Sequence, residues 1–71
     1  VMESTIDGEN DGLDSDAIFK LSNGQIWQQI EYAYDYSYSY MRDVWILQTS
    51  EGFKIILEDI EDEIVGVKRL K

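Results

Sequence analysis

Five tyrosines stand at every second position from Tyr32 to Tyr40, and their type and spacing suit recognition of a ligand. A tyrosine offers a flat apolar ring and a polar hydroxyl at a low cost in conformational entropy, which favours contacts with peptides and sugars. We expect Tyr36, Tyr38 and Tyr40 to be exposed and to form the binding surface. The alternative is that most of the row is structural and forms one wall of the core, with its hydroxyls at the rim. Tyr32 and Tyr34 are expected to belong to this wall.

Trp27 is the fourth candidate binding residue. It lies on the strand face opposite Ile26, and burial on both faces of a strand is expected in a barrel only at its corners. Trp27 is therefore either exposed for binding or packed beneath the acidic N-terminal segment, and we favour the packed position. Trp45 is expected to lie in the core.

Two acidic segments could bind a metal or a basic partner. Residues 7–12 resemble the start of a calcium loop, but the twelfth place, which needs a bidentate Glu, holds Ile18. A solvated acidic turn is the better interpretation. Residues 58–63 carry five carboxylates, and they form either a solvated turn or a patch for a basic partner.

The chain offers few side chains that could take part in catalysis. The chain has no Cys and no His, which excludes thiol nucleophiles, histidine acid–base catalysis and the usual zinc ligands. We find no nucleophile–base pair and no cofactor-binding loop. We expect a protein that is not an enzyme and that holds no cofactor and no metal.

The net charge of −9 and the pI near 4.1 limit the partners. Phosphate groups would be repelled, so nucleic acid and anionic membranes are not expected as partners. A protein, a peptide or a glycan remains. No apolar run is long enough to span a membrane and no signal peptide is recognised, so we expect a soluble protein.

The 71 residues predict a single domain, residues 1–71, with a thin core. Alternation of apolar and polar residues predicts strands, over residues 1–6, 17–21, 25–40, 44–48, 53–57 and 64–70. Asn23-Gly24 lies between two apolar runs, which predicts a hairpin with a type I′ turn.

The predicted strand over residues 25–40 would be roughly 50 Å long at about 3.3 Å per residue, which exceeds the width of so small a domain. It must bend or break, and we expect this near residues 35–39. Before the bend, Tyr32 and Tyr34 would continue the apolar face that Ile26 and Ile30 begin.

The C-terminal part has two interpretations. Apolar residues from Phe53 to Val67 also occur at helical spacing, so a helix over residues 53–69 stays open. The β-branched content and Gly66 favour strand–turn–strand, with the turn over residues 58–63.

Residues 18–29 resemble a pattern found in short bacterial proteins of uncharacterised function, written φ-F-x-L-x-N-G-Q-φ-W-x-Q. The resemblance extends from Glu3 to the basic end at residues 67–71. Members of this group often carry a large aromatic residue near Leu13 and a basic-proline step where Met41-Arg42-Asp43 stands. The resemblance implies a small SH3-like or OB-like barrel and a bacterial source, and it implies no activity.

Together these observations predict an all-β domain of five or six antiparallel strands that form a partly open SH3-like or OB-like barrel. The expected function is a non-catalytic binding module, with Tyr36, Tyr38, Tyr40 and Trp27 as its site. The alternative is a structural domain without a small-molecule ligand, which is either an accessory domain or one that forms homo-oligomers through strand pairing at an exposed edge.

Overall fold

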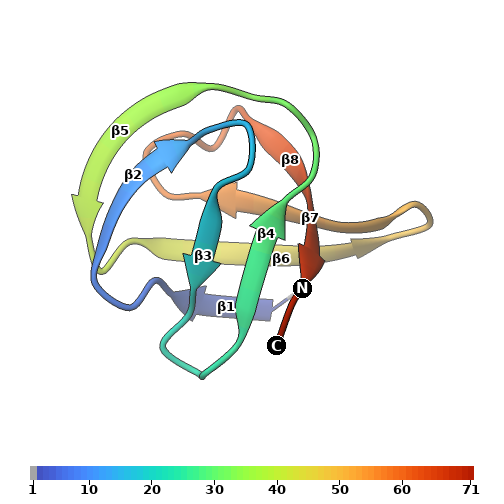
Figure 1. The fold of residues 1–71 in the computed structure, drawn as a ribbon, viewed down its shortest axis with the longest axis horizontal. Helices are drawn as coiled ribbons and strands as arrows, with labels where there is room; N and C mark the ends of the chain where they lie inside the picture. Colours follow the sequence, from blue (N-terminus) through green and yellow to red (C-terminus); the bar gives the residue numbers. More distant parts are fainter. Residues whose placement is uncertain (1) are drawn as a thin grey trace.

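Eight short strands make up the regular structure of residues 2–71, the part of the chain that the computed structural model describes (Figure 1). Val1, the start of the first predicted strand, lies outside the described residues. The all-β prediction is confirmed, but eight strands replace the expected five or six because residues 9–13 also form a strand and residues 25–40 divide into two. In chain order the strands are β1 (Met2–Thr5), β2 (Glu9–Leu13), β3 (Ile18–Lys20), β4 (Ile26–Gln29), β5 (Asp35–Tyr40), β6 (Asp43–Thr49), β7 (Gly52–Leu57) and β8 (Ile64–Arg69).

Six of these strands form one antiparallel sheet in the order β1-β6-β7-β8-β4-β3. The sheet curls until its two edge strands meet at an isolated bridge between Ile6 and Leu21. Beside this bridge, the Asp7 N–H donates to the Lys20 carbonyl and the Ser22 N–H donates to the Thr5 carbonyl, both at 2.8 Å. The result is the predicted small, partly open barrel. β2 and β5 pair separately and arch over one side of it (Figure 1).

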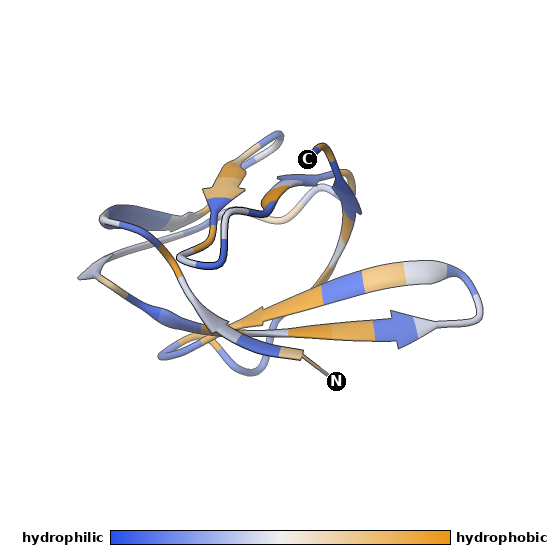
Figure 2. Ribbon diagram, turned by 90° about the horizontal axis from the view of Figure 1, so that it is seen from below, coloured by the Kyte–Doolittle hydropathy of each residue, from blue (hydrophilic) through white to orange (hydrophobic). Residues whose placement is uncertain are grey.

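The core lies on the concave face of the curled sheet. Paired residues of antiparallel strands point to the same side, and Val44, Ile46, Ile55 and Leu57 are paired and buried on this face. The β6–β7 hairpin is apolar where it joins the barrel and polar toward its projecting tip (Figure 2). The buried hydrophobic residues are Ile6, Leu13, Phe19, Leu21, Trp27, Val44, Ile46, Ile55, Leu57, Ile60, Val65 and Val67.

The C-terminal part forms strand–turn–strand, as we favoured, and the helix over residues 53–69 is wrong. β7 and β8 pair from Phe53↔Val67 to Ile56↔Ile64. A strand places Val65 and Val67 on one face, where both are buried, and β-branched side chains pack well on such a surface. The acidic turn between the strands is anchored by Ile60, which is also buried.

The β3–β4 hairpin is confirmed, but its predicted type I′ turn is wrong. The Leu21 N–H donates to the Gln25 carbonyl at 2.9 Å, and the Gly24 N–H donates to the Leu21 carbonyl at 3.1 Å. Gly24 has φ +91°, whereas Asn23 keeps a negative φ. This is a three-residue turn with glycine in the left-handed position. The Asn23 side chain instead accepts a hydrogen bond from the Gln25 N–H at 3.0 Å.

The face of β4 that packs into the core is the opposite of the one that we predicted. Trp27 and Gln29 are buried, whereas Ile26 is half-buried and Ile30 is exposed. Trp27 pairs with Phe19 of β3, which is also buried. Hydropathy misidentified the face because it counts Gln29 as polar, and a polar side chain can be buried when its hydrogen bonds are made.

Gln29 makes these hydrogen bonds to the two segments that leave the barrel. Its Oε1 accepts from the Asp14 N–H at 3.1 Å, and its Nε2 donates to the carbonyls of Glu31 at 2.9 Å and Ala33 at 3.0 Å. β4 ends here, so the break lies at residues 30–34 and not at the predicted residues 35–39. A break is required because an unbroken strand over residues 25–40 would be longer than the molecule, whose longest dimension is 30 Å.

Glu31 holds the segment after this break against the barrel. Its Oε1 accepts hydrogen bonds from Lys54 Nζ at 2.9 Å and from the Gly66 N–H at 2.5 Å. The Ile30 N–H also donates to the Gly66 carbonyl at 2.9 Å. The hydrogen bond from Lys54, then that from Gly66 and the charge of Lys54, lower the pKa of Glu31 below its ordinary value of 4.5.

Replacement of Gln29 by alanine should destabilise the fold. Gln29→Ala leaves the Asp14 N–H and the carbonyls of Glu31 and Ala33 without their partner, and an unsatisfied buried polar group costs about 1–3 kcal/mol. We expect a loss of at least about 2 kcal/mol in the free energy of unfolding, measured by urea denaturation. The control Gln28→Ala, on the opposite face of β4, should stay within about 0.5 kcal/mol. Equal effects in the two variants would contradict the role of Gln29.

The Glu31 contacts should make stability depend on pH. Because the folded pKa lies below the unfolded one, ionised Glu31 contributes stability above the unfolded pKa, and this is lost as the pH falls through the folded pKa. Glu31→Gln should therefore destabilise at pH 7 and should lose most of that effect near pH ~3. Urea denaturation at both pH values checks this. In a Lys54→Gln background the effect of Glu31→Gln should shrink, and an unchanged effect would argue against the Lys54 contact.

Candidate functional site

Tyr36, Tyr38 and Tyr40 lie together on the outer face of β5, as predicted, and all three are exposed. Tyr32 and Tyr34, which we expected in the core wall, are exposed as well and belong to the connection before β5. The exposed fractions of the five tyrosines run from 56% to 79%. The tyrosines do not continue the core face of β4, because β4 ends at the Gln29 network and β5 pairs in a separate sheet.

Trp27 lies in a different place from the tyrosines. It is 3% exposed and packs edge-on against Phe53 of β7, with ring centroids 5.0 Å apart and an interplanar angle of 65°. Its indole N–H donates to Gln25 Oε1 at 3.0 Å. The structure buries Trp27, as we favoured, but packs it against Phe53 of β7 where we expected the acidic N-terminal segment. It does not bring Trp27 into one surface with Tyr36, Tyr38 and Tyr40.

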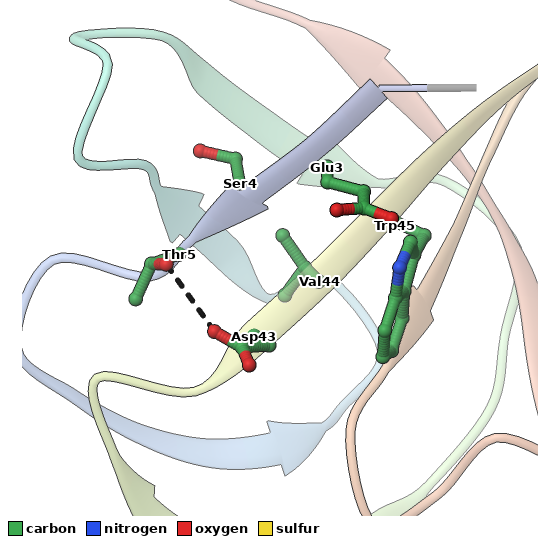
Figure 3. A pocket seen from close by; sticks show the side chains of 6 residues that line it. All are labelled: Glu3, Ser4, Thr5, Asp43, Val44 and Trp45. Carbon is green, nitrogen blue, oxygen red and sulfur yellow. Dashed lines mark hydrogen bonds between the residues drawn. The ribbon is translucent and has the colours of Figure 1, made fainter.

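Trp45 is half-buried on the outer side of the barrel, so its predicted core position is wrong. It lies in a groove of about 250 Å³ along the paired strands β1 and β6. Glu3 and Trp45 stand side by side in this groove, while the Thr5 hydroxyl bonds to the Asp43 carboxylate at 3.3 Å (Figure 3). Both carboxylates are on exposed residues, so the groove lacks the desolvated acid that carboxylate catalysis requires.

Two carboxylates of β2 flank the strand tyrosines. Glu9 and Asp11 are exposed, whereas Asn10 between them is buried. Glu9 pairs directly with Tyr40 across the β2–β5 ribbon. We call the surface formed by Glu9, Asp11, Tyr36, Tyr38 and Tyr40 the tyrosine–carboxylate face. It combines three exposed aromatic rings with two negative charges and no cation.

A bulge at Gly12 sets the shape of this ribbon. The pairing of β2 with β5 shifts register between Asn10 and Gly12, and Gly12 has φ +96°. A Cβ at Gly12 would collide with the Asp35 carbonyl and lie 2.9 Å from the Ser37 nitrogen. Glycine is required here for both reasons. The Gly12 N–H donates to Asn10 Oδ1 at 3.0 Å. This oxygen, which would be a ligand in a calcium loop, is thus a hydrogen-bond acceptor for the backbone of its own strand.

Tyr38 is tied to β2 by its hydroxyl, which donates to Glu9 Oε1 at 3.0 Å. This hydrogen bond, with the nearby negative charges of Glu9 and Asp11, raises the pKa of Tyr38 above its ordinary value of 10.0. The neutral phenol is favoured because its proton is shared with a carboxylate. The tyrosine–carboxylate face is thus partly ordered, with the Tyr38 ring held over β2.

Arg42 lies beneath β5 and is fully buried. Its Nη2 donates to the Ser37 carbonyl and to Ser37 Oγ, the latter at 3.2 Å. The two other guanidinium nitrogens, Nε and Nη1, have no hydrogen-bond partner within residues 2–71. Met41 directs Arg42 inward by taking φ +56°. The small Ser37 and Ser39 alternate with the tyrosines and leave room for this side chain.

Two features of the site were missed from the sequence. Residues 9–13 were not predicted as a strand, because Gly12 and the acidic residues read as turn signals. The alternation of Glu9, Asn10 and Asp11 was the available sign of a strand with one exposed acidic face. The burial of Arg42 has no sign in the sequence, since arginine is rarely fully buried unless paired.

Comparisons of the chain with protein-family models, curated proteins and solved structures found no match. Within residues 2–71, no three acidic side chains gather as a metal site would require. That part of the chain also contains no helix with the length and apolar character needed to cross a membrane.

Removal of the Glu9 charge should lower the pKa of Tyr38. Glu9→Gln keeps the side-chain shape but takes away the carboxylate that shares the phenol proton, so the pKa should fall toward 10.0. The ring resonances of Tyr38, followed by NMR against pH, report this value. Asp11→Asn, which removes only a nearby charge, should give a smaller fall. The same pKa in Glu9→Gln and in the original chain would show that the hydrogen bond does not form in solution.

Proposed function

We propose that this protein is a non-catalytic binding module whose binding surface is the tyrosine–carboxylate face. The observation that carries this proposal is the exposure of Tyr36, Tyr38 and Tyr40 in one row, each more than half exposed. Aromatic side chains would help to fill so thin a core, yet all five tyrosines of this fold are exposed to solvent. Clustered exposed aromatic residues are typical of interaction surfaces.

The partner that fits this face is an extended basic peptide. Alternate residues of a strand lie about 7 Å apart, so the tyrosines match alternate side chains of a peptide that is itself extended. A Lys or Arg side chain can lie over a tyrosine ring, where the cation–π attraction is about 0.5–1 kcal/mol at an exposed site. Glu9 and Asp11 add charge attraction, and the net charge of −9 favours the approach of a cation.

A glycan could stack on the same rings and donate hydroxyl hydrogen bonds to the two carboxylates, but a neutral glycan would lack the charge attraction that a cation gains. The non-catalytic role is supported by the exposure of Glu9 and Asp11, since acid catalysis relies on carboxyl groups whose environments shift their pKa values apart. The bacterial source and the SH3-like or OB-like assignment of the barrel are part of this proposal, and they rest on the resemblance of residues 18–29.

Self-association is the second candidate function, and one observation favours it. Within residues 2–71, β5 has β2 as its one hydrogen-bonded neighbour, so its other edge is a template for pairing with a second chain. The net charge of −9 opposes this arrangement, because two copies of so acidic a chain repel each other. The basic peptide is therefore the better supported partner.

Titration with a peptide of alternating lysine and threonine, about eight residues long, tests the proposal. NMR should show saturable shifts of the Tyr36, Tyr38 and Tyr40 rings. Three lost cation–π contacts predict a weakening of about tenfold to hundredfold in a triple Tyr→Ala variant at these positions. Binding should also weaken in about 1 M salt, where exposed charges are screened.

Tyr32 and Tyr34 provide the matched control, because they are equally exposed but lie outside the face. A double Tyr→Ala variant at these two positions should keep the affinity within about twofold. The proposal fails if the two variants lose affinity equally or if the peptide shifts none of the three rings. A glutamate–threonine peptide and a chitin oligosaccharide serve as competitors, and stronger binding of either would also overturn it. Sedimentation at high protein concentration distinguishes self-association from peptide binding, because self-association would produce a dimer in the absence of peptide.

A further inference from the structure

A second hollow opens at one end of the barrel, away from the β2–β5 ribbon. Val67 is buried and pairs with Phe53, which in turn pairs with Gln48. Trp27 is buried and pairs with Arg69. Because paired side chains point to the same side of a sheet, Phe53, Gln48 and Arg69 face the barrel interior at its open end. All three residues are exposed, so the inner face of the sheet opens to solvent at this end and is not filled by the core.

These side chains line a hollow of about 280 Å³ that we call the barrel mouth. Its floor is apolar and consists of Met2, Trp27, Ile46 and Phe53, of which Trp27 and Ile46 are buried. Its rim is polar and consists of Gln25, Gln48 and Arg69. An apolar cavity with a few converging polar groups is the usual form of a small-ligand site, and barrel mouths are among the usual positions.

The polar groups of the rim are mostly donors. Gln25 Oε1 already accepts from the Trp27 indole, which leaves the amide N–H₂ of Gln25 directed to other partners. Arg69 Nε donates to the Lys71 carbonyl at 3.0 Å. The lining contains no acidic side chain. A ligand in the barrel mouth would therefore meet an apolar floor and hydrogen-bond donors at the rim.

Among residues 2–71, Arg69 is the one charged side chain in the lining of the barrel mouth, and it belongs to a basic stretch of the sequence. Three of the six Lys and Arg residues, Lys68, Arg69 and Lys71, occur within the last four positions of the chain. We infer that the barrel mouth binds a small carboxylate with an aromatic or branched apolar body, the carboxylate meeting Arg69 and the apolar body lying on Trp27 and Phe53. The volume is just below the roughly 300–1,000 Å³ of sites for drug-sized ligands, so the ligand is small. This inference does not depend on the tyrosine–carboxylate face.

Phenylacetate is a suitable probe, and the Trp27 indole N–H is the reporter because it lies in the floor. Its NMR resonance should shift saturably with phenylacetate. Phenylacetamide, which has the same shape without the charge, should bind about tenfold more weakly or worse, since a hydrogen bond to a charged group contributes about 1.5–3 kcal/mol. Arg69→Gln should weaken phenylacetate binding by a similar factor.

Lys68→Gln is the matched control for Arg69→Gln. It removes the same charge from the neighbouring position of β8, whose side chain is exposed and does not line the barrel mouth. This variant should keep the affinity within about twofold. The inference is overturned if Trp27 shows no saturable shift up to about 5 mM phenylacetate, a weak affinity even for a small ligand. It is also overturned if the amide binds as well as the acid, or if both variants lose affinity equally. If phenylacetate shifted only the resonances of the tyrosine rings, it would bind at another surface, and this too would overturn the inference.

Discussion

The buried side-chain amide of Gln29 is the interaction on which the arrangement of the two sheets depends. It accepts one hydrogen bond from the connection that follows β2 and donates two to the connection that precedes β5. Both connections belong to the ribbon, while Gln29 itself belongs to the barrel. A side chain at the end of β4 therefore joins the two sheets. Burial of the Gln29 amide without these hydrogen bonds would cost free energy. The amide can therefore be buried only where the chain crosses beside it, and the crossing is held in place by the same hydrogen bonds.

The consequence of this crossing is that the tyrosines leave the core. Had β4 continued straight, its alternation would have carried Tyr32 and Tyr34 onto a face of the main sheet. The chain instead crosses to a second sheet, where Tyr36, Tyr38 and Tyr40 point outward and the small Ser37 and Ser39 lie between them. Arg42 fills the space beneath and bonds to Ser37. The row of exposed rings thus depends on a buried amide and a buried guanidinium.

The two candidate surfaces have opposite chemistry. The tyrosine–carboxylate face is aromatic and negative, which suits a cationic partner. The barrel mouth has an apolar floor and a rim of donors beside the basic C-terminal residues, which suits an anion. Their separation follows from the topology, because one lies on the ribbon and the other at the open end of the barrel. A strongly acidic protein can offer such an anion site because three of its six Lys and Arg residues occur together at the end of the chain.

Each position of the pattern φ-F-x-L-x-N-G-Q-φ-W-x-Q that specifies a single residue has a role in this fold. Phe19 and Leu21 are buried in the core, and Asn23 and Gly24 form the turn. The three residues Gln25, Trp27 and Gln29 share the inner face of the strand, where Gln25 bonds to Trp27 and Gln29 joins the sheets. The pattern thus describes what the hairpin needs in order to fold, and its Gln25 and Trp27 also line the barrel mouth.

Local sequence determined the strands of the barrel and the β3–β4 hairpin, because alternation and turn residues act over a few positions. Tertiary structure alone decided which face of β4 is buried, that Glu9 and Asp11 flank the tyrosines, and that Gln48, Phe53 and Arg69 converge. The physical reason is that burial of a polar group depends on partners distant in the chain. Gln29 and Arg42 read as surface residues until Ala33, Asp14 and Ser37 are brought beside them.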